Sequence, residues 1–140
     1  MLDGVTQSGA IPALERMLEF AARRHELIVG NIANLDTPGF RPVDVSVRGF
    51  REQLGAAIDH RRETGGPLRI EATDEVRLVD GRLELAPRPA GANLLFHDGN
   101  DRSLERIMQD LVENFSMFRF AAQMLQSRYD LIDAAIRERP

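Results

Sequence analysis

Three histidines are the first residues to consider for chemistry, because imidazole can ligate a metal and can act as a general acid or base near neutral pH. They are His25, His60 and His97, in a predicted helix, a polar stretch and a predicted linker. No second histidine or cysteine lies at metal-ligand spacing from any of them, so they do not indicate a metal site. His25 falls on an apolar helical stripe, where a polar residue can fix the register of two packed helices.

The acidic segment "HDGND", which begins at His97, is the other candidate ligand set. It lacks the alternating oxygen ligands and the final glutamate of a calcium loop, and it is typical of a turn that caps a helix. The chain also has no phosphate-binding glycine loop, nucleophile elbow or His-Glu-x-x-His motif. Because there is no cysteine, a thiol nucleophile and a thiolate metal site are excluded. The sequence therefore predicts that the protein is not an enzyme and binds no metal or cofactor.

The segment "NIANLDTPGF", which begins at Asn31, closes a predicted helix. Pro38 disfavours helix at the residue before it, and Gly39 supplies the positive φ of a type II turn. Asn31 and Asn34 lie three positions apart and so share a face near the end of the helix. Their amides either bond the last carbonyls of their own helix or bond across to another helix or subunit while the turn directs Phe40 back toward the helix. The residues favour these two interpretations equally.

Two helices with heptad spacing are predicted at the two ends of the chain. The first runs from Pro12, which suits the opening turn of a helix, to Leu35, and would be about 36 Å long. Its apolar positions alternate by four and three, with His25 as the one interruption. This N-terminal stripe consists of Leu14, Leu18, Ala21, Ile28, Ile32 and Leu35.

The second helix carries an unbroken stripe of the same spacing. Asn100, Asp101 and Ser103 are each suitable as its N-cap, and no glycine or proline follows before Pro140. We therefore expect one helix of about 50 Å. This C-terminal stripe consists of Leu104, Met108, Leu111, Phe115, Phe118, Ala122, Leu125, Tyr129, Ile132 and Ile136.

The middle of the chain has a different pattern. Val43, Val45 and Val47 alternate with polar residues, and a short helix is predicted to follow, with Phe50, Leu54, Ala57 and Ile58 on its apolar face. In "VRLVDGRLEL", Asp80-Gly81 suits a type I′ turn. That turn would set Val76 opposite Leu85, Arg77 opposite Glu84 and Leu78 opposite Leu83. "APRPAGANLLFHDGN" has no periodicity and is predicted to be a linker.

The predicted fold is mainly α, with two long terminal heptad helices and a small, partly β insert that contains a hairpin. Residues 1–40 form the first helix and its junction, residues 41–100 the insert, and residues 101–140 a helix that pairs with the first. At 140 residues the chain is the size of one domain. The longer C-terminal helix would extend about 15 Å beyond its partner, and exposed apolar stripes usually mark a partner surface. Self-assembly through the terminal helices is the leading physical interpretation.

The charge and hydropathy of the chain argue against nucleic acid and membranes as partners. The net charge is −4, and the 18 basic residues are spread along the chain without a basic run. Neither nucleic acid nor an anionic membrane surface would find a matching patch. No stretch reaches the ~18 apolar residues of a membrane span, and the first residues lack the pattern of a secretory signal.

The two terminal segments resemble the bacterial flagellar rod and hook proteins. "NIANLDTPGF" is similar to their N-terminal signature, an Asn-[Ile/Val/Leu]-Ala-Asn core followed by Thr-Pro-Gly-[Phe/Tyr]. "NFSMFRFAAQMLQSRYDLIDAAI" is similar to their C-terminal segment, with Asn114, Phe118, Gln123 and Leu125 at expected places. Length, "RPVDV" and the entry to the last helix look closest to the proximal rod proteins. The resemblance assigns the family junction to Asn31, Ile32, Asn34, Thr37, Pro38, Gly39 and Phe40.

The resemblance implies a structural subunit of the flagellar basal body. Such a subunit is made in the cytoplasm, exported by the flagellar type III apparatus without a cleaved signal peptide, and assembled in the periplasmic rod. There its terminal helices pack as a coiled-coil layer that transmits torque. Its partners would be other copies of itself, neighbouring rod proteins, and export-gate or adaptor proteins at the base. The alternatives are another axial rod subunit and a cytoplasmic coiled-coil adaptor or export chaperone, which would show the stripes without needing the junction.

Overall fold

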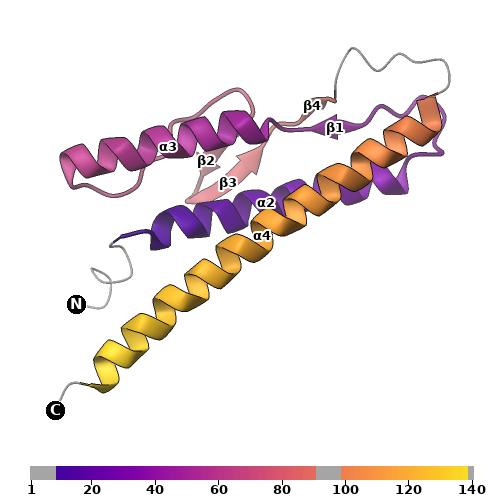
Figure 1. The fold of residues 1–140 in the computed structure, drawn as a ribbon. Helices are drawn as coiled ribbons and strands as arrows, with labels where there is room; N and C mark the ends of the chain where they lie inside the picture. Colours follow the sequence, from indigo (N-terminus) through magenta and orange to yellow (C-terminus); the bar gives the residue numbers. More distant parts are fainter. Residues whose placement is uncertain (1–8, 91–98, 139–140) are drawn as a thin grey trace.

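Helix α2, Ile11–Ala33, is the central element of the fold (Figure 1). The computed structural model describes residues 9–90 and 99–138, with the side chains of residues 99–103 left out. Proline occupies the first turn of α2, where its missing N–H needs no partner. The helix ends at the Asn34 cap, so its 23 residues span about 35 Å, in agreement with the sequence pattern.

Helix α4, Gly99–Arg137, crosses α2 in the antiparallel sense (Figure 1). Asn114 of α4 is hydrogen-bonded to Ala21 of α2, and Tyr129 of α4 to Glu15 of α2. The residue numbers therefore rise along α4 as they fall along α2. Its 39 residues span about 58 Å, more than the sequence suggested. It begins at Gly99, within the predicted linker; His97 and most of that linker lie outside the described residues, as do the side chains of the expected caps. The prediction of a mainly α fold with two long terminal helices is confirmed.

The hairpin of β2, Val76–Val79, and β3, Arg82–Leu85, has the predicted register. The turn residues Asp80 and Gly81 have φ values of 50° and 79°, the two positive angles of a type I′ turn. The hairpin is attached to α2, because the Glu19 carboxylate accepts the Leu83 N–H at 2.6 Å and Arg16 donates to the Gly81 carbonyl at 2.9 Å.

Helix α3, Val47–Thr64, is longer than the short helix expected from the sequence. Ser46 caps it by accepting the Gly49 N–H, and Gly65 ends it with φ 71°. This early cap limits the valine-rich segment before it to a two-residue strand, β1, Val43–Asp44. Strand β1 pairs antiparallel with β4, Arg88–Pro89, and closes the insert.

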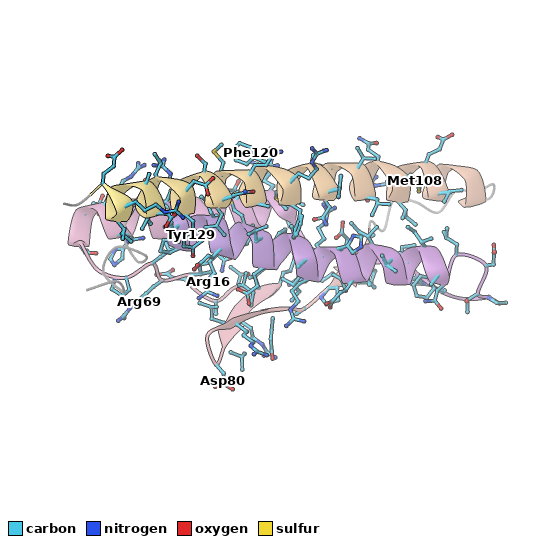
Figure 2. All side chains as sticks on the ribbon, turned by 90° about the horizontal axis from the view of Figure 1, so that it is seen from below. Arg16, Arg69, Asp80, Met108, Phe120 and Tyr129 are labelled. Carbon is cyan, nitrogen blue, oxygen red and sulfur yellow. The ribbon has the colours of Figure 1, made fainter. Side chains whose placement is uncertain are left out.

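The hydrophobic core lies where α2, α3, the hairpin and α4 meet. Phe20 of α2 stacks on Phe50 of α3 with ring centroids 3.9 Å apart, and both rings are buried. Leu83 contributes from β3 and Met117 from α4. Helix α2 thus lies between the hairpin on one side and α4 on the other (Figure 2). Among the described residues, none of the helices has the length and apolarity that a membrane crossing requires.

Candidate assembly surface and helix junction

Asn31 and Asn34 have different partners at the end of α2. The Asn31 amide donates to the Val43 carbonyl at 2.8 Å and accepts the Val43 N–H at 3.0 Å, so it pairs with β1 as a neighbouring strand would. The Asn34 amide instead donates to the Gly30 carbonyl at 2.8 Å, one turn back in its own helix. Asn34 therefore satisfies a helix-end carbonyl, whereas Asn31 bonds across the junction within the same chain.

The turn between these elements has the predicted geometry. Gly39 has φ 76°, and the Phe40 N–H donates to the Thr37 carbonyl at 3.1 Å. In a four-residue turn closed by such a hydrogen bond, proline at the second position and a glycine with positive φ at the third are typical of type II. Pro38 and Gly39 are exposed and Phe40 is half-buried. The turn returns the chain to the Asn31 side chain, so the junction residues act together in directing β1 along α2.

A buried ion network missed by the sequence reasoning lies beside this junction. Arg24 is 3% exposed, and its guanidinium donates to both oxygens of Asp44, at 2.9 and 2.6 Å. It also lies 3.5 Å from Asp110 of α4. Its Nη1 atom has no hydrogen-bond partner in the described part of the chain. One arginine of α2 therefore holds both the insert and α4.

Asn114 is the second polar residue buried between α2 and α4. It is 1% exposed, and its side-chain amide donates to the Ala21 carbonyl at 2.8 Å. Its Oδ1 atom finds no partner among the described groups. A single polar residue at a heptad contact favours the one register in which it is bonded. Asn114 and Arg24 together disfavour a slip of α4 along α2.

The free energy of unfolding of Asp110→Asn, compared with that of the original chain at the same pH, should increase as pH rises from about 3.5 to 7. Burial raises the pKa of the Asp110 carboxyl above its ordinary 3.8 and Asp44 adds to this, which outweighs the lowering effect of Arg24. The folded chain then retains a proton that the unfolded chain has lost, so the stability from protonated Asp110 is present below pH 3.8 and is lost as pH rises through the folded pKa. Urea unfolding of both chains at several pH values measures the difference; a difference independent of pH would contradict this.

The N-terminal stripe is largely buried. Leu14, Ala21 and Ile28 are buried, and Leu18, Ile32 and Leu35 are half-buried. His25 was expected on this stripe, but it is exposed, and the polar residue buried here is its neighbour Arg24. Arginine can take that place because its partners, Asp44 and Asp110, arrive from distant parts of the chain.

The C-terminal stripe is mostly uncovered in the isolated chain. Leu111, Ala122, Leu125 and Ile132 are half-buried, and Gln123 beside them is exposed. The residues that bury α4 against the core lie on a neighbouring face, which the sequence reasoning did not select apart from Asn114: Ile107, Asn114, Met117 and Ala121. The exposed members of the stripe are Leu104, Met108, Phe115, Phe118, Tyr129 and Ile136. Their role in assembly stays a prediction.

The exposed area of the C-terminal stripe is large for a single chain of this size. Phe115 is 55% exposed and Phe118 is 41% exposed. With about 200 Å² for each large side chain, the exposed members present on the order of 600 Å² of mostly apolar surface. Monomers rarely present a larger patch, and a standard interface buries about 800 Å² on each partner.

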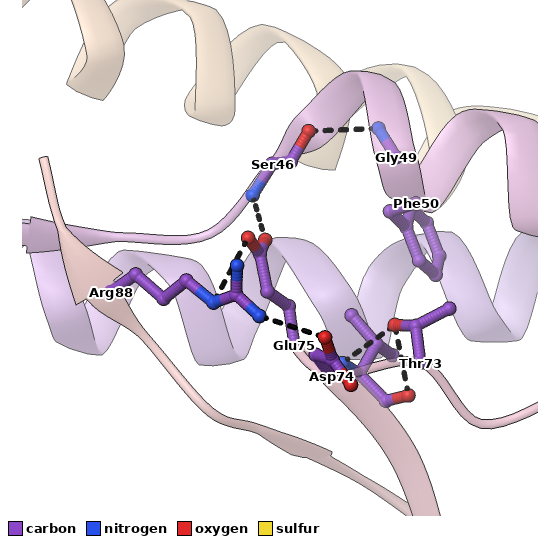
Figure 3. Close-up of a pocket in the computed structure, with 8 residues that line it drawn as sticks. Ser46, Gly49, Phe50, Thr73, Asp74, Glu75 and Arg88 are labelled. Atoms are coloured by element: carbon purple, nitrogen blue, oxygen red, sulfur yellow. Dashed lines mark hydrogen bonds and ion pairs between the residues drawn. The ribbon is translucent and has the colours of Figure 1, made fainter. Parts of the chain in front are cut away.

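A small depression lies at the N-terminal end of α3 (Figure 3). Its volume is about 240 Å³, and its polar groups bond one another. The Ser46 N–H donates to Glu75 at 2.7 Å, and Arg88 donates to Asp74 at 3.0 Å. These contacts attach β4 and the start of β2 to α3, so we interpret the depression as a structural feature of the insert.

Comparison with known proteins shows that the chain is similar to flagellar basal body rod proteins. The protein called flagellar basal body rod protein FlgB in Yersinia enterocolitica is 28% identical over 121 residues, which cover 81% of this chain and 82% of the relative. The FlgB of Yersinia ruckeri matches with the same identity and coverage. No protein-family model and no solved structure matches the chain. The similarity supports a FlgB-like flagellar rod relation over most of the chain.

Proposed function

We propose that this chain is a structural subunit of the proximal rod of the bacterial flagellar basal body, with no catalytic role. The main support for the proposal is the uncovered C-terminal stripe, because exposed apolar surfaces of this size usually mark a site of contact with another protein. The similarity to two FlgB proteins supports the same conclusion. In this role the chain is exported by the flagellar type III apparatus and assembles in the periplasm.

The terminal helices supply the contacts in this proposal. The C-terminal stripe packs against other copies of the chain, neighbouring rod proteins, or proteins at the base of the rod, and the resulting layer transmits torque. The junction from Asn31 to Phe40 holds the insert at a constant angle to α2, so that each copy presents the same surface. A rigid angle suits a part that must carry torque.

The double substitution Phe115→Asp/Phe118→Asp should abolish assembly while leaving the folded chain intact. Both rings are about half exposed, so charge at these positions costs little in the isolated chain but would be buried without a partner in an interface. Sedimentation velocity over a wide concentration range measures assembly of the purified chain, and circular dichroism measures its helicity. In a strain that lacks the original gene, the variant should be exported yet fail to restore rods or swimming.

The control is Val79→Asp, which places the same charge on an exposed apolar residue of the hairpin. It should assemble and restore swimming. Full motility with the double variant would contradict the proposal. Retention of the double variant in the cytoplasm would instead assign these phenylalanines to export.

A further inference from the structure

Helix α4 has a second exposed apolar face, separate from the C-terminal stripe. Its members are Phe120, Met124 and Leu131, which are 54%, 41% and 60% exposed. Phe118 of the stripe and Phe120 lie two positions apart, so at about 100° per residue their side chains leave the helix about 160° apart. Figure 2 shows Phe120 on the side of α4 that points away from α2. We call these three residues the second face.

The second face and the C-terminal stripe flank the surface that α4 presents to the core. Met117 and Ala121, which are buried, lie between them around the helix. Between Phe115 and Leu125, α4 is therefore apolar on three of its four sides. The remaining side carries Ser116, Arg119 and Gln123, all exposed. A helix that is apolar nearly all round is normally enclosed by other protein.

Nothing in the described part of the chain encloses this end of α4. Arg51 of α3 forms an ion pair with Glu113 at 3.9 Å, seven positions before the second face begins at Phe120. Farther along, α4 continues past the start of α2 (Figures 1 and 2). The Tyr129 hydroxyl still donates to Glu15, but from the flank opposite the second face.

The areas of the two faces indicate how they are covered. The second face exposes on the order of 300 Å² and the C-terminal stripe on the order of 600 Å², so each copy reaches the area of a standard interface, about 800 Å², only when both of its faces are covered. A closed two-fold dimer joins one self-complementary face and would leave the other uncovered. Two faces on opposite flanks of one helix are both covered when each copy contacts two neighbours in a head-to-tail manner.

We propose that the second face of α4 packs against the C-terminal stripe of a second copy of this chain, so that each α4 lies between two others. This rests on the proposed function, and it assigns to Phe120, Met124 and Leu131 a contact distinct from that of Phe115 and Phe118. Knobs from the second face would enter the spaces between stripe residues, as in other heptad interfaces. Assembly therefore needs both faces of every copy except the two at the ends.

The test uses two variants, alone and mixed. Phe115→Asp/Phe118→Asp removes the stripe contact, and Phe120→Asp/Leu131→Asp removes the second-face contact. Each variant alone should lose all oligomers in sedimentation velocity, because no copy can complete a head-to-tail pair. An equimolar mixture should form dimers that grow no further, since one chain supplies an intact stripe and the other an intact second face.

Every other outcome is informative. Normal assembly of the second-face variant would overturn this inference while leaving the proposed function intact. A mixture that stays monomeric would show that the second face does not meet the stripe of another copy, and a purified original chain that never self-associates would exclude a second copy as the occupant. If both variants restore swimming, the proposed function fails as well. Phe120→Ala/Leu131→Ala, which adds no charge, repeats the measurement if the aspartate variant loses helicity.

Discussion

Arg24→Leu should lower the free energy of unfolding by about 3–5 kcal/mol, the usual cost of removing one partner from a buried ion pair. The substitution leaves Asp44 and Asp110 without their shared cation in a region from which water is largely excluded. It also releases the contact that joins the insert to α4. Equilibrium unfolding in urea, followed by circular dichroism, measures the loss.

Arg23→Leu is the matched control for this prediction. Arg23 is the adjacent arginine of the same helix, but it is exposed and lies 3.7 Å from Glu26, also exposed. Surface pairs of this kind contribute about 0–1 kcal/mol, so the control should unfold almost as the original chain does. Equal losses in the two variants would show that the network does not stabilise the fold.

Neutralising the stranded carboxylates should restore part of the stability. In the triple variant Arg24→Leu/Asp44→Asn/Asp110→Asn, no buried charge is left without a partner. The amide introduced in place of the Asp44 carboxylate would still offer an oxygen to the Val45 N–H, which Asp44 accepts at 2.8 Å. A triple variant less stable than Arg24→Leu would indicate that the carboxylates contribute by more than pairing with the arginine.

The parts of the fold that are set by residues close together in the sequence could be predicted from the sequence. The hairpin is one, because Asp80-Gly81 selects the turn and the turn sets every pair in the ladder. The two long helices are another, because heptad spacing has no other regular interpretation over so many residues. The type II turn also follows from Pro38 and Gly39 alone.

The contacts between helices could not be predicted in the same way. Helix α4 carries two faces of heptad spacing one position apart, through Ile107 and Asn114 on one and Met108 and Phe115 on the other. The second is the more apolar, so it dominated the pattern, yet the face with Asn114 lies on α2. Its amide is satisfied by a carbonyl 93 residues away in the sequence. Arg24 was missed for the same reason, since nothing near it in the sequence indicates a buried partner.

The two asparagines of the junction offer the sharpest comparison in the chain, because the same substitution should have unequal effects. Asn31→Ala leaves both the N–H and the carbonyl of Val43 without their partner, and Asn31 is only 5% exposed. At about 1–3 kcal/mol for each of the two groups left unsatisfied, the loss should reach about 2–6 kcal/mol. Asn34→Ala removes two local bonds at a half-buried position, the one to the Gly30 carbonyl and a long one of 3.4 Å from the Thr37 hydroxyl, and should cost about 0.5–1.5 kcal/mol.

Hydrogen exchange at the Val43 amide separates the two effects directly. In Asn31→Ala this amide should exchange faster than in the original chain, because its acceptor is gone, while in Asn34→Ala it should be unchanged. The effect should extend to Arg24, because Asp44 follows Val43 and is placed by the same strand. If instead both variants lose equal stability and Val43 stays protected, the asparagines only cap α2. The position of β1 along α2 would then depend on the Arg24 network alone.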